Sequence, residues 1–480
     1  MLDGYLTLGG VEIANSARLE AYLESIGSPL DSVGVCHCDT FTAELVGDEP
    51  YTTPAEDEAP WYDEDVPESG EFAGLMVLTV DGLDDNPVSR TVTQSAAGGA
   101  VIGPARPQPL TITVTGLLLG STCCGAEYGL RWLGQALAGC AGPCGDDCLT
   151  LYNCCPGPDL TEEEFAARHR RTLRRVALVD GPRVTARQGD GCTSGTCKSG
   201  ADIITVEFVL TAASPWQWAD PVTMLDRLPV PTDDGSECIT WCVHGSPTAP
   251  ARPVCVIPDE ACPPGAVAAD VVDAAGCSVD WPVLDRDAPC DMPCRHAPCP
   301  DPQELCGDPS CRTPTPPAPP QPDTCFCRAL AVNSSYAELD LSRWPRHFGA
   351  VPMIEVYAGR TDLRRLTIEI YERTANHEGM ACEEVAVAER CNPHSVYEIA
   401  FVPAGGWHTL DGQVGRAFVE CGGVCEGSPD AYGRDGGPLA FPLLDCASYC
   451  VAIHADAIFT PADDATITLS LAGRDYTAPL

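Results

Sequence analysis

The sequence of 480 residues has little positive charge. It contains a single lysine, Lys198, and 28 basic residues in all against 69 acidic ones, so its formal net charge at pH 7 is −41. A surface with this excess of carboxylates repels phosphate groups. The composition therefore argues against a protein that binds nucleic acid or anionic lipid over most of its surface.

Long apolar runs are also missing. No stretch approaches the ~18 consecutive apolar residues that a membrane-spanning helix needs. The first five residues show no basic segment followed by an apolar core, which a secretory signal would require. We therefore expect a chain that is neither exported by a signal peptide nor anchored in a membrane.

Complete catalytic motifs are absent as well. Residues 195–199 lack the first glycine and the strand context of a phosphate-binding loop, His377-Glu378 lacks the second histidine of a zinc protease helix, and no G-x-S-x-G sequence occurs. Pairs of carboxylates carry no information about glycoside hydrolysis in a chain with 69 acidic residues. We predict that the protein is not an enzyme and has no catalytic residue, metal site or cofactor.

Cysteine, in contrast, is abundant, with 29 residues, an odd number. Thiols stay reduced in the cytosol, so a chain without an export signal but rich in cysteine suggests a protein made inside a cell and used outside it, as a virion component is. Zinc usually takes two C-x2-C pairs or cysteine with histidine, whereas C-x3-C dominates here. Disulfides are the favoured interpretation and zinc the alternative. The C-x3-C spacing occurs at Cys140/Cys144/Cys148, Cys238/Cys242, Cys290/Cys294, Cys421/Cys425 and Cys446/Cys450.

A strand over residues 203–212 is the strongest structural signal. Ile204, Val206, Phe208 and Leu210 fall on one face of a period-two pattern, which predicts a long strand with one buried side. Ser214-Pro215 then ends the strand, because proline has no N–H to donate to a neighbouring strand. Two tryptophans follow.

This order of strand, small residue, proline and aromatic exit resembles the end of the ring-forming domain of siphophage distal tail proteins, with Ser214 where that family often has aspartate. The segments 89–92, 98–99 and 111–114 resemble the strand, glycine loop and Thr-Ile-Thr-Val strand of the family's inner barrel. The resemblance implies a β-barrel or sandwich that closes into a ring, with a hexamer as the expected form.

Three helices are predicted in the N-terminal region. Residues 15–25 carry apolar side chains at helical spacing, residues 126–138 form a short amphipathic helix, and Thr161 with Glu164 marks the start of another short helix that runs toward Leu173. Residues 176–179 and 183–187 are predicted to form a hairpin around Asp180-Gly181.

The predicted helix after Thr161 carries the only basic cluster of the chain. These arginines could neutralise acidic surroundings, or they could contact the acidic stretch of a neighbouring subunit, since arginine pairs bidentately with carboxylates. Nucleic-acid binding is a third and weaker alternative. The predicted subunit-interface residues are Arg168, Arg170, Arg171, Arg174 and Arg175.

Residues 47–71 hold ten acidic residues among prolines, in a stretch without a basic residue. A solvated surface loop is the simplest interpretation. The alternative is an acidic collar that faces a DNA channel or a metal-rich interface, although the spacing of a calcium loop is absent.

The middle of the chain is rich in proline and cysteine. Eighteen of the 45 prolines lie within residues 250–322, ten cysteines lie within 255–327, and residues 313–320 form a polyproline spacer. We expect a linker that depends on disulfide cross-links for its order.

From residue 328 the pattern returns to many short strands with turns between them, which predicts a β-sandwich. This region resembles the galectin-like or carbohydrate-binding-module-like domain of some tail proteins. Trp407 and Tyr432, with Trp344, could stack on a sugar ring, but a lone tryptophan in a sandwich more often belongs to the core.

The sequence thus predicts a mainly β protein with a ring-forming domain over 1–225, a linker over 226–327 and a sandwich over 328–480. The leading hypothesis is a structural protein of the phage tail tip, assembled in the host cytoplasm, that joins the tail tube to the tip. Its partners would be further copies of itself, the tail tube protein, the tape measure protein, other hub proteins and host cell-wall glycan, while the passing DNA is not bound. The alternatives are a carbohydrate- or receptor-binding adhesin and a tail-associated glycan hydrolase.

Overall fold

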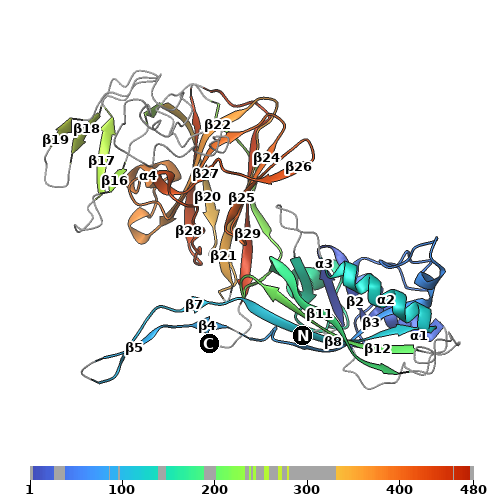
Figure 1. Cartoon of the computed structure of the whole chain (residues 1–480). Helices are drawn as coiled ribbons and strands as arrows, with labels where there is room; N and C mark the ends of the chain where they lie inside the picture. Colours follow the sequence, from blue (N-terminus) through green and yellow to red (C-terminus); the bar gives the residue numbers. More distant parts are fainter. Residues whose placement is uncertain are drawn as a thin grey trace, which may run out of the picture. The chain divides into compact units, whose positions relative to one another are not determined.

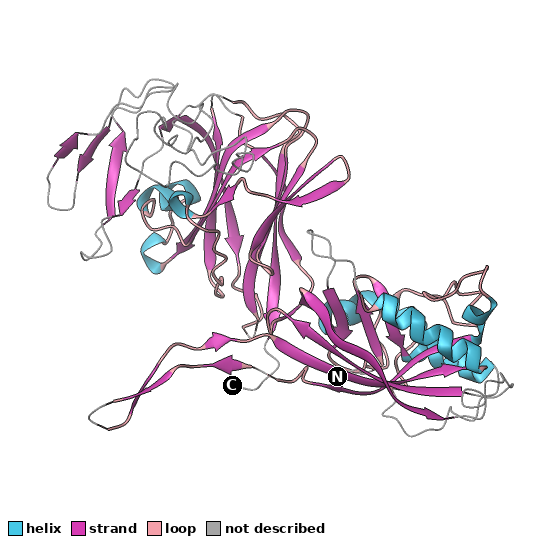
Figure 2. Ribbon diagram, viewed as in Figure 1, coloured by secondary structure: helices cyan, strands magenta, loops and turns pink. Residues whose placement is uncertain are grey.

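The structure is a computed structural model. It describes residues 4–25, 38–85, 87–95, 98–138, 148–188, 202–232, 237–238, 242–244, 253–258, 269–272, 278–280, 331–346, 348–457 and 459–475. The fold is mainly β, as predicted, with four α-helices among these residues (Figure 2).

Contacts divide the chain into two compact units. The N-terminal unit comprises Met1–Pro221 and Ala472–Leu480, and the C-terminal unit comprises Val222–Leu471. The end of the chain therefore returns to the N-terminal unit. Most of the predicted linker lies outside the described residues, so the three predicted domain ranges stay a prediction.

The N-terminal unit is built on a four-stranded antiparallel sheet in the order β11-β12-β8-β3 (Figure 1). Its strands are β3 (Phe72–Asp81), β8 (Leu110–Gly120), β11 (Val176–Gln188) and β12 (Asp202–Ala212). Ile204, Val206 and Phe208 are at most 1% exposed, which confirms the predicted buried face of the central strand. Helix α2 (Cys123–Ala136) packs on this sheet and buries Ala126 and Leu133.

A second sheet of this unit runs in the order β2-β1-β9-β10-β13, and the last residues of β29 pair with β13. Its members are β1 (Tyr5–Leu8), β2 (Val11–Asn15), β9 (Cys148–Tyr152), β10 (Arg170–Arg174), β13 (Gln217–Trp218) and β29 (Thr466–Asp475). Helices α1 (Ser16–Ser25) and α3 (Glu162–His169) belong to the same unit.

Two local predictions in this unit were wrong. The helix that begins at Thr161, whose hydroxyl accepts from the Glu164 N–H as predicted, ends at His169, because residues 170–174 pair with β9 and β13 as a strand. The predicted hairpin over 176–187 is the single strand β11. Its register shifts around residues 180–183, and this bulge accommodates Gly181-Pro182 while both halves pair with β12.

The C-terminal unit packs two sheets around one apolar core, as expected for a sandwich. One sheet has the order β15-β20-β28-β22-β23-β27, and the other contains β14, β29, β21, β24, β25 and β26. Ile368 and Ile453 from the first sheet and Ile354, Leu410 and Leu469 from the second belong to the same buried cluster.

The strands of the first sheet are β15 (Glu237–Cys238), β20 (Ala331–Asp340), β22 (Leu363–Arg373), β23 (Ser395–Val402), β27 (Ala431–Tyr432) and β28 (Ser448–Asp456). Those of the second, besides β29, are β14 (Val222–Pro229), β21 (Gly349–Tyr357), β24 (Trp407–Asp411), β25 (Arg416–Cys421) and β26 (Val424–Gly427).

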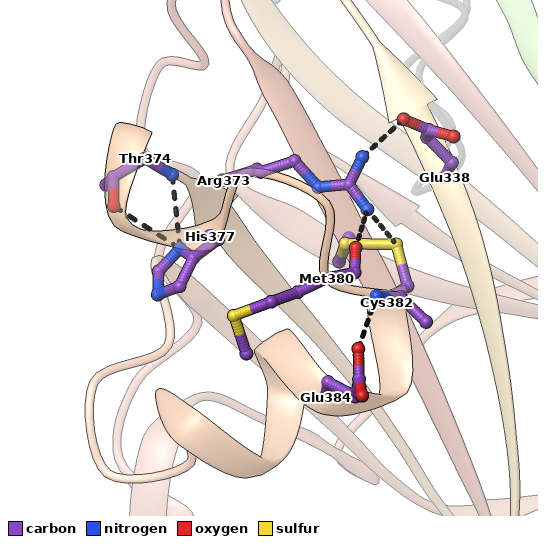
Figure 3. Close-up of a disulfide and its surroundings, with 9 residues drawn as sticks. Glu338, Arg373, Thr374, His377, Met380, Cys382 and Glu384 are labelled. Carbon is purple, nitrogen blue, oxygen red and sulfur yellow. Dashed lines mark hydrogen bonds and ion pairs between the residues drawn. A yellow bond between two sulfur atoms is a disulfide. The ribbon is translucent and has the colours of Figure 1, made fainter.

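Two smaller features complete the unit. Helix α4 (Cys382–Ala388) contacts β28, and Cys382 forms a disulfide with Cys450 of that strand (Figure 3). A four-stranded antiparallel sheet lies in the cysteine-rich region, with β16 (Cys242–His244), β17 (Pro253–Pro258), β18 (Ala269–Val272) and β19 (Ser278–Asp280).

Candidate functional site

The most exposed apolar surface of the N-terminal unit is a hairpin that we call the arm, residues 88–107. It consists of β4 (Val88–Ser89) paired with β7 (Arg106–Pro107), and β5 (Val92–Gln94) paired with β6 (Ala100–Ile102). The arm connects β3 to β8 and extends beyond them (Figure 1). All ten residues of its four strands are exposed.

Three large aliphatic side chains of the arm are about two-thirds exposed. Val92 is 63% exposed, Val101 67% and Ile102 64%, and Val92 lies directly opposite Ile102 across the hairpin. Polar contacts support the backbone: Arg90 Nη1 donates to the Gly103 carbonyl at 3.2 Å, and Gln108 Nε2 donates to Ser89 Oγ at 2.9 Å. The arm thus presents an ordered apolar surface to its surroundings.

The charge of the arm is opposite to that of the chain. No aspartate or glutamate occurs from Asn86 to Ala126, and the arm contains Arg90 and Arg106. This acid-free run was the signal in the sequence that could have identified the arm. Residues 89–92 do not form one continuous strand, since β4 ends at Ser89 and β5 begins at Val92, and all four residues are exposed. Their place in an inner barrel stays a prediction.

The acidic segment, residues 47–71, is the second candidate surface. Trp61, only 4% exposed, anchors it by donating from Nε1 to the Phe72 carbonyl at 3.0 Å and by edge contacts with Phe72 and Trp132. Among its carboxylates, Glu49, Glu56, Glu58, Asp63, Glu64, Asp65 and Glu68 are exposed. The segment therefore presents an anchored surface of exposed carboxylates. The solvated loop and the acidic collar both stay predictions.

One end of the acidic segment is held by a buried cation. Arg18 is 6% exposed and pairs with Glu12 at 2.8 Å and with Asp48 at 3.3 Å. Its guanidinium lies 4.2 Å from the ring centroid of Tyr51, whose hydroxyl donates to Asp48 at 2.6 Å. Burial opposes the charge on Arg18, but the Glu12 carboxylate raises the pKa of the guanidinium overall.

The five predicted interface arginines have different surroundings. Arg171 is 4% exposed and pairs with Asp475 at 3.3 Å, and Arg170 pairs with Asp220 at 2.8 Å. Burial lowers the pKa of Arg170, but the Asp220 carboxylate outweighs it and raises that pKa overall. Arg174 is half-buried in β10, whereas Arg168 and Arg175 are exposed. Arg170 and Arg171 therefore form ion pairs within the chain. Arg168 pairs only loosely with Glu164 at 3.9 Å and stays exposed, so Arg168 and Arg175 are the members best placed for a neighbouring molecule.

The predicted sugar-contact residues lie on different sheets of the C-terminal unit. Trp407 in β24 is 45% exposed, and its ring lies 4.7 Å from that of Tyr357, its cross-strand partner in β21. Tyr432 lies in β27, the edge strand of the other sheet, and burial raises the pKa of its hydroxyl. Trp344 is half-buried against the core and donates from Nε1 to the Phe348 carbonyl at 3.1 Å. The structure thus brings Trp407 together with Tyr357, which the sequence had not singled out.

The described part of the chain has neither a cluster of metal-ligating side chains nor a helix suited to a membrane. There, no group of three or more histidine, cysteine or acidic side chains is placed to hold a metal ion. None of the helices described is both long and apolar enough to cross a membrane.

Comparison with known proteins finds a weak structural similarity. No protein-family model matches the sequence, and no curated protein matches it. Among solved structures, the chain is similar to the Dit protein of phage SPP1, described as a paradigm of the hub adsorption apparatus in phages that infect Gram-positive bacteria. The TM-score is 0.29 at 10% identity, over 83% of this chain and 93% of that one. A likeness at this TM-score carries no argument about fold or function.

Proposed function

We propose that the protein is a structural component of a phage tail tip and that copies of it associate through the arm into a ring. The class follows from the resemblance of the strand and its Ser214-Pro215 exit to distal tail proteins. The observation that supports association most directly is the arm, with exposed side chains at Val88, Val92, Val101 and Ile102.

The physical argument begins with the instability of a lone hairpin. Two strands by themselves are marginally stable in water, and their unpaired edges can accept a further strand. The arm needs a partner that covers Val92, Val101 and Ile102 and compensates Arg90 and Arg106. A second copy of this chain, with a net charge of −41, offers carboxylates for the arginines.

Finer details of the proposal come from the resemblance. The ring would have six copies and would join the tail tube to the tip, next to the tail tube protein, the tape measure protein and other hub proteins. It would be assembled in the host cytoplasm and then remain in the virion. Arg168 and Arg175 would add contacts to the acidic segment of the next copy.

Mass photometry of the full chain tests the association. Replacement of the three most exposed aliphatic residues of the arm by serine (V92S, V101S and I102S together) should shift the mass distribution toward the monomer, because the contact loses most of its apolar area. The matched control replaces two valines of similar exposure outside the arm, Val179 at 58% and Val424 at 59%, by serine and should leave the oligomer intact. A wild-type protein that stays monomeric at all concentrations, or arm variants that assemble like the wild type, would contradict the proposal.

A second candidate function is adhesion to a glycan, and one observation favours it. The exposed ring of Trp407 packs beside Tyr357, and paired aromatic rings offer an apolar platform for a sugar. Trp407→Ala should weaken binding to cell-wall polysaccharide about tenfold, since stacking contributes roughly 1–2 kcal/mol. Val387→Ala, at an exposed position of α4, is the control. Equal binding by both variants would remove the support for this function.

A further inference from the structure

Two cysteine side chains from distant parts of the N-terminal unit meet beside a small aromatic core. Cys38 is 7% exposed and packs with Phe41, Tyr152 and Phe165. Cys155 follows β9 and is exposed. Cys38 Sγ lies 3.4 Å from Thr40 Oγ1, which contacts the residue after Cys155, and neither Cys38 nor Cys155 is in a disulfide.

The chain segments that carry these thiols are held together independently of the sulfur atoms. Thr40 Oγ1 donates to the Pro156 carbonyl at 2.7 Å, one residue beyond Cys155. On the other side, the ring of Phe41 lies 6.3 Å from that of Tyr152, which stacks on Phe165 at 4.3 Å. These contacts on both sides hold the two chain segments next to each other.

We propose that Cys38 and Cys155 are a site of disulfide formation. Both thiols lose a proton, a bond forms between the two Sγ atoms, and the two electrons reduce a small-molecule disulfide such as oxidised glutathione to two thiols. The exposed Cys155 is the thiol that such an oxidant reaches first. The mixed disulfide then exchanges with the buried Cys38, and the second small thiol leaves.

The neighbouring Cys154 is not a suitable partner for Cys155. Cys154 is exposed and adjacent to Cys155, and a bridge between adjacent residues is strained. Cys154 therefore serves as an internal control with nearly the same solvent access.

The surroundings of Cys155 also set the pH dependence of the reaction. Burial, followed by the contact with Cys38, raises the pKa of the Cys155 thiol to about 12. The thiolate is the reactive form, so at neutral pH few molecules react. Each pH unit between 7 and 9 should accelerate closure roughly tenfold, until another step becomes limiting.

The bond would attach the residues that lead into the acidic segment to the loop before α3. Cys38 lies at the start of the described stretch 38–85, which contains that segment, and Cys155 lies between β9 and α3. Because the closed loop is long, the cross-link should raise the midpoint of thermal unfolding by several degrees. The chain would assemble with free thiols in a reducing compartment and gain the cross-link outside it.

Peptide mapping of the full-length protein tests the site. The reduced protein is treated with oxidised glutathione, alkylated without reductant and digested; mass spectrometry should find the Cys38 peptide joined to the Cys155 peptide, and reduction should release it. Cys154→Ser should keep this linked peptide and the gain in melting temperature. Cys155→Ser should lose both. The proposal is overturned if Cys38 is alkylated after oxidation, if it is joined to Cys154 or Cys36, or if C155S gains the same melting temperature on oxidation as the wild type. These outcomes are independent of ring formation.

Discussion

At the scale of single residues, two glycines of helix α2 have opposite roles. A Cβ at Gly129 would clash with the ring of Phe72, whereas a Cβ at Gly134 would meet nothing within 4 Å. Gly129 therefore permits close packing of α2 on β3, while Gly134 only adds freedom to the unfolded chain.

This contrast gives a matched pair of substitutions. Gly129→Ala should lower the free energy of unfolding by about 1–3 kcal/mol through overpacking. Gly134→Ala should raise it by about 0.5–1 kcal/mol, because alanine favours the helix. Urea unfolding followed by circular dichroism measures both. Equal effects of the same sign would show that the contact with Phe72 does not limit the site.

At the scale of elements, helix α4 depends on a covalent bond and on polar contacts. The Cys382–Cys450 disulfide joins its first residue to β28, where Cys450 is completely buried. Beside it, Arg373 donates to Glu338 at 2.7 Å and to the Met380 carbonyl at 3.0 Å, and Glu384 accepts from the Ala381 N–H at 2.8 Å (Figure 3). A helix of seven residues is too short to be stable alone, so these contacts must hold it.

Loss of the Cys382–Cys450 disulfide should therefore lower the stability of the C-terminal unit. Cys382→Ser should reduce the free energy of unfolding of the C-terminal unit by about 2–4 kcal/mol, as expected for a loop of 68 residues. Cys446→Ser, at an exposed cysteine outside any disulfide, should change it by less than about 0.5 kcal/mol. Denaturant unfolding without reductant compares the two, and a stability of C382S equal to that of C446S would refute the role of the bond.

At the scale of the whole molecule, the charge of −41 far exceeds the magnitude of roughly 2–8 that gives a small domain its solubility. A tail tip must let DNA pass without binding it, and carboxylates repel phosphate within about a Debye length, ~8 Å at physiological salt. In the proposed ring, part of this acidic excess would serve that purpose.

We therefore expect the inner wall of the ring to carry more aspartate and glutamate than arginine. Electron cryomicroscopy of assembled tails measures this directly, with the outer wall of the same ring as the internal comparison. A neutral or basic inner wall, with the carboxylates confined to the outside, would exclude this role for the acidic residues.

The sequence alone determined those elements whose residues repeat with a clear period. The alternation of Ile204, Val206, Phe208 and Leu210 predicted β12 and its buried face, and the Thr161 cap predicted the start of α3. Strands β21, β22, β23, β25, β28 and β29 of the C-terminal unit were found in the same way, whereas β14, β24, β26 and β27 were not predicted. These features are local. The periodicity of apolar residues and the hydrogen bond of an N-cap side chain both involve residues that are close together in the sequence.

Only the tertiary structure decided the features that depend on a distant strand. Residues 170–174 form a strand because β9 and β13 lie on either side, and residues 176–188 remain one strand because β12 pairs along their length. Residues 88–94 are exposed, since none of the described sheets covers the arm. The proximity of the segments that carry Cys38 and Cys155, and of Trp407 and Tyr357, likewise arises because the fold brings distant parts of the chain together. Alternation of apolar and polar residues predicts a strand. Which strand it pairs with, and whether a sheet or helix packs over it, decide what it can bind.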